Sequence, residues 1–521
     1  MQNPIAVVNL GWILHCNCEG TEQLRKEIEK MEKKNTWETY NDKQLKEVDV
    51  FADEYRSFLD EGKTERECVD YIVNAAEKAG YRELKTVMKK GDKLKKGDKV
   101  YAVWMNKSVV MFRIGEQPMA EGMNILGAHI DSPRLDVKQN PLYEEGGFAY
   151  LDTHYYGGVK KYQWVTIPLA LHGVIVKKDG TVVEINIGEN EDDPVFFISD
   201  LLIHLAQEQL EKKASKVIEG EALDIIIGNK PFIFNKEKAA DKESKHGEET
   251  EGKKKDKKDK KDKERAKEAV KKGILDILKK TYDVEEEDFL SAELEVVPAG
   301  KAREAGLDRS MILAYGQDDR VCAFSSLKAM LEVEESKRTA CCLLVDKEEI
   351  GSVGATGMQS RFFENMVAEV MNLTGEYSEL NVRRCLSSSC MLSSDVSSAF
   401  DPAFASSFDK KNVAYLGGGM VFNKFTGSRG KSGSNDANAE YLAHIRQIFE
   451  KEKINFQTAE LGRVDLGGGG TIAYILALYG MNVIDSGVAV LNMHAPWEAT
   501  SKVDVYETKR GYEAFLRGAD L

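Results

Sequence analysis

The pattern of apolar and polar positions divides the chain into a helical beginning, a strand-rich middle and an alternating last part. The segment VFADEYRSFLDEGKTERECVDYIVNAAEKAGY has apolar residues at helical spacing, which predicts helices within residues 21–80. Two strands follow in KVYAVWMNKSVVMFRIG, with a turn at Asn106 and Lys107. A third strand is predicted in MNILGAHIDSP, where Pro133 ends it.

Between residues 133 and 230 the pattern is that of short strands. The stretch YQWVTIPLALHGVIVKKDGTVVEINIG predicts strands joined by a hairpin turn at Asp179 and Gly180. The apolar stretch that follows, VFFISDLLIHLAQEQLEKK, is typical of a helix. These features predict a β-rich unit in the middle of the chain.

After about residue 290, apolar strands alternate with helices. Strands such as TACCLLV and MNVIDSGVAV alternate with helical stretches such as RVCAFSSLKAMLEVEE and NAEYLAHIRQIFEKEK. Such alternation predicts an α/β sheet with helices on both faces. Because the first part of the chain suits the same layers, we expect one α/β domain from residues 1–132 and 290–521, interrupted by a β-rich insertion at 133–289.

Residues 236–265 form a low-complexity charged stretch inside this insertion. They include 13 Lys or Arg and 10 Asp or Glu residues and almost nothing apolar, which predicts a disordered surface loop. A basic tail that binds nucleic acid is the alternative, but its acidic residues are interleaved with the lysines. The net charge of −14 for the whole chain also argues against a nucleic-acid partner.

Length and composition narrow the class of protein further. The 521 residues, 42% of them hydrophobic, suffice for a large core in about two or three structural units. No apolar run reaches the roughly 18 residues of a membrane span, so we expect no membrane partner. The beginning, MQNPIAVVNLGWILHCNCEG, has no basic residue before its apolar stretch and makes a poor signal peptide. The eight cysteines therefore predict reduced thiols in a cytoplasmic protein.

Histidine and carboxylate side chains occur where predicted strands end or helices begin, which is where sites form in α/β domains. They supply two imidazoles and several carboxylates, a donor set suited to zinc, cobalt or manganese. Two such ions need one shared carboxylate, and hydrolysis also needs a free carboxylate that takes a proton from water. The candidates are His129 and Asp131 in GAHIDSPR, Asp318 and Asp319 in YGQDDRVCAF, Glu348 and Glu349 in DKEEIGS, Asp395 in SSDVSSAFDP, and His494 in LNMHAPWEATS.

Each candidate also has an ordinary structural interpretation. A histidine at a strand end is usually only hydrogen-bonded, and an aspartate before a helix is usually an N-cap. Two adjacent glutamates in a loop are usually both solvated. The motifs lie too far apart along the chain for their spacing to establish that they meet in space.

Five motifs, in this order, resemble the signatures of the aspartyl aminopeptidase and vacuolar aminopeptidase I family of dinuclear zinc exopeptidases. They are GAHIDSPRLDVK, DKEEIGS, SSDVSSAFDP, DLGGGGTIA and MHAPWE. The resemblance extends from about Asn124 to Asp504, apart from the charged stretch. It implies a three-layer zinc-exopeptidase-like catalytic domain, two divalent metal ions (zinc, with cobalt or manganese as alternatives), and removal of N-terminal residues from peptides.

The resemblance also implies a role for each residue of the motifs. His129 would bind one metal, and Asp131 would orient that imidazole. Asp318 would bridge the two metals and be joined to Asp319 by a cis peptide bond. Glu348 would be the general base. The remaining ligands would be Glu349 and Asp395, one at each metal, and His494.

The β-rich insertion resembles the dimerisation domain of this family, which implies dimers assembled into a dodecamer with an enclosed chamber. His172, in IPLALHGV, is the candidate for a histidine that reaches a neighbouring subunit's site and contacts the substrate. Family members that prefer acidic N-terminal residues have a lysine in the segment that corresponds to GGGMVFNKFTGSRGKSGSNDANAEY, where GMVFNKF places Phe422 or Lys424 near that position. Phe422 at that position would favour a neutral or apolar first residue, and Lys424 an acidic one.

Some alternatives stay open at this point. The glycines of LGGGGTIA, residues 466–473, either let a substrate approach the backbone or form the turn before a helix. The same metal-site plan would also suit an N-acyl amino acid deacylase or a carboxypeptidase. A catalytically silent assembly protein is the alternative outside enzymology.

Overall fold

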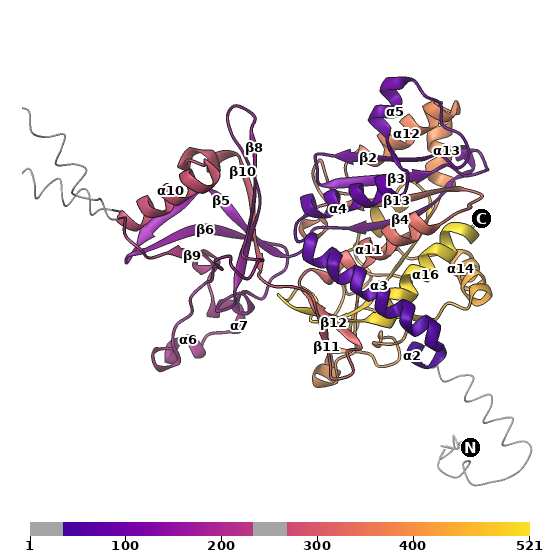
Figure 1. The fold of residues 1–521 in the computed structure, drawn as a ribbon. Helices are drawn as coiled ribbons and strands as arrows, with labels where there is room; N and C mark the ends of the chain where they lie inside the picture. Colours follow the sequence, from indigo (N-terminus) through magenta and orange to yellow (C-terminus); the bar gives the residue numbers. More distant parts are fainter. Residues whose placement is uncertain (1–34, 233–267, 521) are drawn as a thin grey trace, which may run out of the picture.

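The computed structural model describes residues 35–232 and 268–520, which form a mixed α/β fold with three β-sheets. Figure 1 shows a larger lobe, built around a nine-stranded sheet, beside a smaller lobe that contains a six-stranded sheet. The predicted charged loop at 236–265 lies outside the described residues. Within the two described ranges, no helix has the length and apolar character needed to span a membrane.

The nine-stranded sheet carries the predicted strand ends. Its four neighbouring strands β13, β4, β14 and β18 are parallel, so their carboxyl ends lie at one edge. Strands β2 and β3 form the hairpin that was predicted around Asn106 and Lys107. In spatial order the strands are β1 (Arg82–Glu83), β2 (Lys99–Trp104), β3 (Ser108–Arg113), β13 (Thr339–Val345), β4 (Met123–His129), β14 (Cys390–Ser394), β18 (Asn482–Gly487), β16 (Met420–Asn423) and β17 (Phe456–Thr458).

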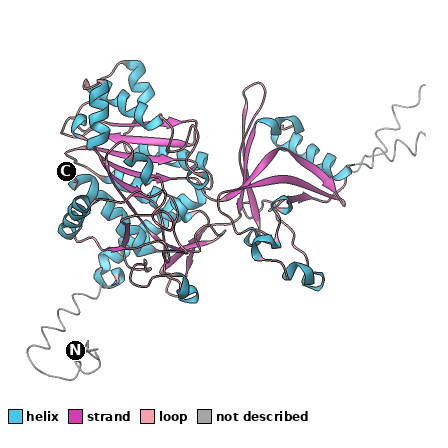
Figure 2. Ribbon diagram, turned by 180° about the vertical axis from the view of Figure 1, so that it is seen from behind, coloured by secondary structure: helices cyan, strands magenta, loops and turns pink. Residues whose placement is uncertain are grey.

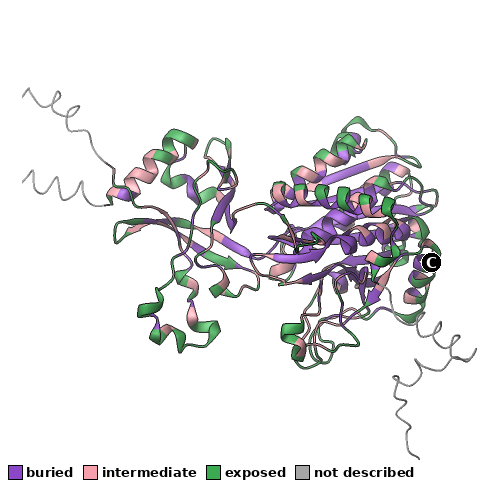
Figure 3. Ribbon diagram, turned by 60° about the horizontal axis from the view of Figure 1, so that its bottom comes forward, coloured by how far each residue is buried: buried purple, intermediate pink, exposed green. Residues whose placement is uncertain are grey.

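Helices pack on both faces of this sheet. All seven residues of β13 are buried, and alternate residues join two separate apolar clusters, which explains the unbroken apolar run of TACCLLV. Figure 3 shows these central strands as buried. One cluster includes α3 (Asp42–Glu61), α4 (Glu65–Lys78), α11 (Gln317–Glu332), α14 (Ala439–Glu452) and α16 (Lys502–Gly518); the other includes α5 (Leu84–Lys90), α12 (Phe362–Thr374), α13 (Glu379–Ser388) and α15 (Ala473–Ala477).

The smaller lobe is formed by the six-stranded sheet, whose strands are drawn in magenta in Figure 2. Strands β7 and β8 form the hairpin predicted around Asp179 and Gly180. Helix α10 (Ala269–Tyr282) packs on the same sheet. In spatial order the strands are β8 (Val182–Ile187), β7 (Leu169–Val176), β10 (Ala292–Pro298), β5 (Arg134–Glu145), β6 (Phe148–Tyr156) and β9 (Ile225–Gly228).

Two predictions about this region are wrong. The boundary at 289/290 is too early, because β10 takes its hydrogen-bonding partners from β5 and β7 of the inserted sheet. The helix predicted over VFFISDLLIHLAQEQLEKK is replaced by extended chain, a short 3-10 helix (Ile203–Leu205) and the four-residue helix α6 (Gln207–Leu210). The cause is tertiary: Phe196 exchanges backbone hydrogen bonds with Leu169 and buries its ring against the sheet.

A third, five-stranded sheet joins segments that are far apart in the sequence. Ala314, four residues before Asp318, lies opposite Glu498, four residues after His494. This pairing brings the start of α11 close to the loop that carries His494. The strands, in order, are β11 (Arg303–Ala305), β12 (Met311–Ala314), β20 (Glu498–Ser501), β19 (Ala489–Leu491) and β15 (Ser397–Ser398).

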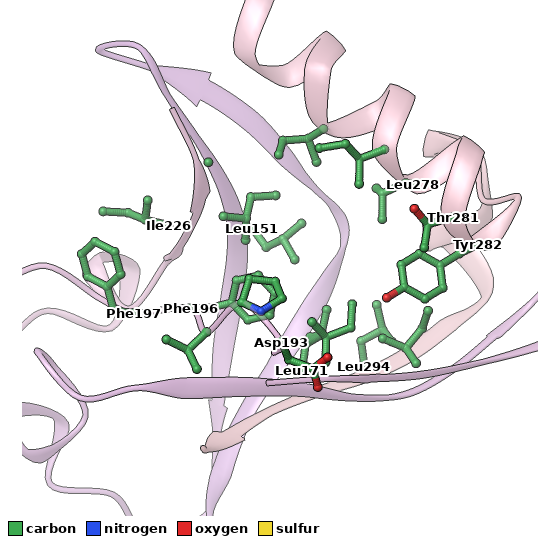
Figure 4. A pocket seen from close by; sticks show the side chains of 18 of the residues that line it. Leu151, Leu171, Asp193, Phe196, Phe197, Ile226, Leu278, Thr281, Tyr282 and Leu294 are labelled. Carbon is green, nitrogen blue, oxygen red and sulfur yellow. The ribbon is translucent and has the colours of Figure 1, made fainter. Parts of the chain in front are cut away.

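A cavity of about 660 Å³ lies between the inserted sheet and α10. Figure 4 shows its mainly apolar wall, which includes Leu151, Leu171, Leu278 and Leu294. None of the candidate site residues lines it. This cavity is therefore not the predicted metal site, whose residues lie at the edge of the nine-stranded sheet.

The described cysteines are all buried. Six of them, from Cys68 to Cys390, are free thiols in the described ranges. Burial raises the pKa of Cys68 to about 12, so this thiol stays neutral. Free, neutral thiols are what the sequence predicts.

Candidate metal centre

The candidate residues meet at the carboxyl edge of the nine-stranded sheet. His129 is the last residue of β4, and it lies opposite Val345, the last residue of β13. Glu348 and Glu349 lie three and four residues after the end of β13, and Asp395 directly follows β14. Parallel strands bring these ends together, while the five-stranded sheet brings in the other two residues, Asp318 and His494.

Two groups of metal-ligand type form at this edge, and they share Asp318. In the first, Nε2 of His129 lies 3.4 Å from Oδ1 of Asp318 and 4.0 Å from Oδ1 of Asp395. In the second, Nε2 of His494 lies 3.1 Å from Oδ2 of Asp318 and 3.6 Å from Oε2 of Glu349. The two oxygens of one carboxylate thus face different groups.

These separations suit zinc. Zinc bonds of about 2.0–2.2 Å arranged tetrahedrally place neighbouring ligand atoms about 3.3–3.6 Å apart. The chemistry of the donors fits as well, because imidazole nitrogen and carboxylate oxygen are common zinc ligands. Oε1 of Glu349 is buried without a hydrogen-bond partner, which leaves acceptor capacity for a cation.

The electrostatics of the protein alone also favour a cation here. Burial, together with the neighbouring carboxylate of Asp318, raises the pKa of Glu349 well above its ordinary value. Burial and Asp319 do the same to the pKa of Asp395. Burial opposes ionisation of Asp318 too, but hydrogen bonds with His129 and His494 outweigh it and lower its pKa. Several carboxylates packed this closely need positive charge to be ionised together.

The Asp131 carboxylate connects the parts of the site. Its Oδ1 lies 3.2 Å from Nδ1 of His129 and accepts a hydrogen bond from the Glu348 amide at 3.1 Å. Its Oδ2 accepts from the Glu349 amide at 3.2 Å. The backbone carbonyl of Asp131 is also 3.0 Å from Nδ1 of His129. With Nδ1 engaged in this way, Nε2 is directed toward Asp318 and Asp395.

Glu348 lies beside both groups and belongs to neither. Burial raises the pKa of its carboxyl to about 7, an effect that His129 opposes and Asp131 reinforces. A carboxylate that is close to the donor set but outside it can exchange protons with a bound molecule. The two adjacent glutamates therefore occupy different environments.

The peptide bond between Asp318 and Asp319 is cis, as the resemblance implies. The Asp319 carboxylate belongs to neither group, and its Oδ2 accepts a hydrogen bond from the His129 amide at 3.4 Å. Asp318, and not Asp319, is thus the shared residue of the two groups.

Two residues important to this geometry were not singled out from the sequence. The buried Glu498 carboxylate accepts hydrogen bonds from the amides of Asp318, at 3.0 Å, and His494, at 2.7 Å. It is the last residue of MHAPWE, so the motif itself was a signal. Tyr156 donates its hydroxyl to Asp131 Oδ2 at 2.9 Å, and nothing in the sequence marks it.

Two predicted substrate-binding residues are not available to a substrate. Phe422 has no exposed surface, and its ring packs against Phe449 and Phe456 in the core. His172 is 1% exposed and lies between Glu67 and Glu189 of its own chain. The predictions for Phe422 and His172 are therefore wrong, because the strand direction turns both side chains inward.

The third predicted residue, Lys424, is half-exposed and pairs with Asp436. It lies just beyond the end of β16, where the chain leaves the sheet. Two of the four glycines of residues 466–473, Gly467 and Gly468, are explained by contacts within the chain. A Cβ atom on Gly467 or Gly468 would come within 1.7 Å of the Leu461 oxygen or 2.0 Å of the Gly427 oxygen. Helix α15 begins at Ala473, which favours the turn interpretation.

Comparison with known proteins identifies relatives over nearly the whole chain. The family model described as aminopeptidase I zinc metalloprotease (M18) matches residues 58–516. A probable M18 family aminopeptidase 1 from Clostridium acetobutylicum is 60% identical over 93% of this chain and 98% of its own length. The crystal structure of an M18 aminopeptidase from Thermotoga maritima has a TM-score of 0.83 at 40% identity, covering 94% of this chain and 100% of that one. The yeast mApe1 dodecamer is more distant, with a TM-score of 0.67 at 20% identity over 90% of this chain and 97% of its own.

Proposed function

Since this chain belongs to the M18 family of aminopeptidase I zinc metalloproteases, we propose that it removes N-terminal residues from peptides with two zinc ions and with Glu348 as the general base. Aminopeptidase activity and the use of zinc follow from the family. The number of ions and the role of Glu348 are proposed here. The observation that carries this proposal is the pair of donor groups that share Asp318.

Each side chain of the site has a proposed role in metal binding or proton transfer. His129 and Asp395 would hold one ion, His494 and Glu349 the other, and Asp318 would contact both. Bound zinc would supply Lewis-acid activation of water and of the scissile carbonyl. Glu348 would take the proton of the attacking water and pass it to the leaving amine. Asp131 would fix the orientation of the His129 imidazole and the position of the Glu348–Glu349 backbone through its hydrogen bonds.

The role of the inserted lobe, the oligomeric state, the substrate contact of Lys424 and the cellular location are also proposed. The inserted lobe would serve as a dimerisation domain, and the chain would form a homo-oligomer of dimers, as large as the dodecamer of the yeast relative. Exposed apolar side chains on that lobe support this, because Leu202, Ile203 and Leu205 are 54%, 66% and 68% exposed in the single chain. Lys424 is proposed to contact the first residue of the substrate. The buried free thiols support a cytoplasmic location.

Metal removal should abolish activity reversibly. Incubation with 1,10-phenanthroline, followed by desalting, should reduce hydrolysis of an amino acid anilide to background, because the Lewis acid that activates water and the scissile carbonyl is then removed. Adding Zn²⁺, Co²⁺ or Mn²⁺ should restore it.

The same assay with the N-acetylated anilide should show no turnover. Preference for the acetylated form would favour a deacylase, and cleavage from the C-terminus a carboxypeptidase.

Removal of one proposed ligand should lower metal content and rate together. We expect Glu349→Ala and Asp395→Ala each to reduce bound zinc from two ions per chain to one or fewer. Activity should fall by about 100-fold or more, since even outer residues of metal sites are worth 10–100-fold. Metal content is measured by atomic emission. Asp401→Ala, from the same motif as Asp395, should keep both ions, because Asp401 only caps the turn at Pro402.

A further inference from the structure

The end of strand β6 crosses from the inserted lobe into the metal centre. Its last residue is Tyr156, and Gly157 and Gly158 follow directly. Each of these three residues lies against a different side chain of the site: Tyr156 against Asp131, Gly157 against Glu349 and Gly158 against His494. The remainder of β6 belongs to the inserted sheet, where it pairs with β5 and β9.

Tyr156 is held firmly where it meets Asp131. Its hydroxyl donates to Oδ2 of Asp131 at 2.9 Å, and its side chain is almost fully buried. The guanidinium group of Arg134 lies 3.8 Å from the ring centroid and is itself paired with Glu65 at 2.7 Å. Burial and the adjacent Asp131 raise the pKa of Tyr156 far above its ordinary value, so the hydroxyl remains a donor.

The Tyr156 hydrogen bond completes the set of donors to Asp131. Backbone amides of Glu348 and Glu349 each bind one oxygen of this carboxylate. Tyr156 adds a side-chain donor from the other lobe, on Oδ2, which leaves Oδ1 directed toward His129. The Asp131 carboxylate, held by donors from both lobes, is less free to rotate than a carboxylate held only by the Glu348 and Glu349 amides.

Gly158 contacts His494, which belongs to the second group. Its carbonyl oxygen lies 3.0 Å from Nδ1 of His494, so a proton on Nδ1 is donated to it and Nε2 remains free toward Asp318 and Glu349. The approach is close enough that an added Cβ would push its neighbours by a few tenths of an ångström. A Cβ at Gly158 would lie 3.1 Å from Nδ1 of His494, and one at Gly157 would lie 3.2 Å from Cβ and Oε2 of Glu349.

From these contacts we infer that Tyr156, Gly157 and Gly158 are positioning residues of the metal centre, through which the inserted lobe orients Asp131 and His494. The inference rests on the proposed function, since it takes His129 and His494 as zinc ligands. Its consequence is that the insertion contributes to zinc affinity within its own chain, in addition to any part it has in assembly.

The test is zinc affinity in the full-length protein, measured by competition with a chelator of known affinity. Tyr156→Phe removes only the hydroxyl and keeps the ring against Arg134. Gly158→Ala adds one methyl group, at a residue whose φ lies outside the left-handed region.

Each of these two variants should weaken zinc binding by about 10- to 100-fold. Gly158→Ala should affect one of the two binding steps. Tyr155→Phe, at the 43% exposed neighbour, should change nothing.

The melting temperature of the metal-free protein separates positioning from folding. Support requires weaker zinc binding by both variants with an unchanged melting temperature. Wild-type affinity in both variants would overturn the inference, and so would a loss of affinity matched by a lower melting temperature of the metal-free protein. His494→Ala is measured in parallel. If it keeps both zinc ions, the proposed ligand set is wrong; if it loses one while Gly158→Ala does not, only the present inference is wrong.

Discussion

Replacing Glu348 by glutamine should lower kcat by about two to four powers of ten while leaving bound zinc unchanged. Glutamine has the same shape but cannot accept a proton from water at neutral pH. Glu348 lies outside both donor groups, so no metal ligand is lost. Its amide hydrogen bond to Asp131 comes from the backbone and is kept. The measurement pairs steady-state kinetics on an amino acid anilide with zinc content on the same preparation.

A matched control is available on helix α12. Glu364→Gln changes a glutamate whose partners are Arg361 and the Tyr479 hydroxyl, outside the site, and should leave kcat and zinc unchanged. A Glu348→Gln enzyme with wild-type turnover would show that another group takes the proton. Loss of zinc from this variant would show instead that Glu348 is a ligand.

Replacing Asp318 by asparagine should have the second large effect. The two oxygens of Asp318 face His129 and His494 separately, and asparagine supplies only one oxygen. Its amide nitrogen cannot bind a cation, so bound zinc should fall to one ion per chain or fewer. Losing the Lewis acid at one position costs several kcal/mol in the transition state, which corresponds to about a 10³-fold lower kcat/KM.

The neighbouring residue provides the control for this prediction. Asp319→Asn retains an oxygen that can accept from the His129 amide. Burial raises the pKa of Asp319 well above its ordinary value, so a neutral side chain suits its surroundings. This variant should keep both zinc ions and most of the activity. Two full equivalents of zinc in Asp318→Asn would contradict the shared-ligand geometry.

Much of the larger lobe follows from local patterns. The apolar run of TACCLLV predicts a buried strand because every apolar residue of β13, from Ala340 to Val345, belongs to one of two cores. The hairpins at Asn106 and at Asp179 follow from short-range turn chemistry. The stretch VFFISDLLIHLAQEQLEKK does not follow its local pattern, because an apolar run predicts burial without saying which partner provides it.

The chemistry of the site follows from its motifs only in part. The residue types and their order predict a zinc centre, and the structure brings His129, Asp318, Glu349, Asp395 and His494 into the two groups. For Phe422 and His172, a one-residue change in strand register reverses the direction of the side chain. Their burial therefore could not be read from the resemblance.

The sequence by itself determined the α/β alternation, the separate β-rich insertion, and a set of imidazole and carboxylate side chains at strand ends. These are properties of short segments, which depend on local periodicity and residue chemistry. Only the tertiary structure decided that Asp318 divides its two oxygens between the groups, that Glu498 fixes the backbone around it, and that Tyr156 and Gly158 reach the site from the inserted lobe. Such contacts depend on how sheets from distant parts of the chain pack together, and no local pattern records this.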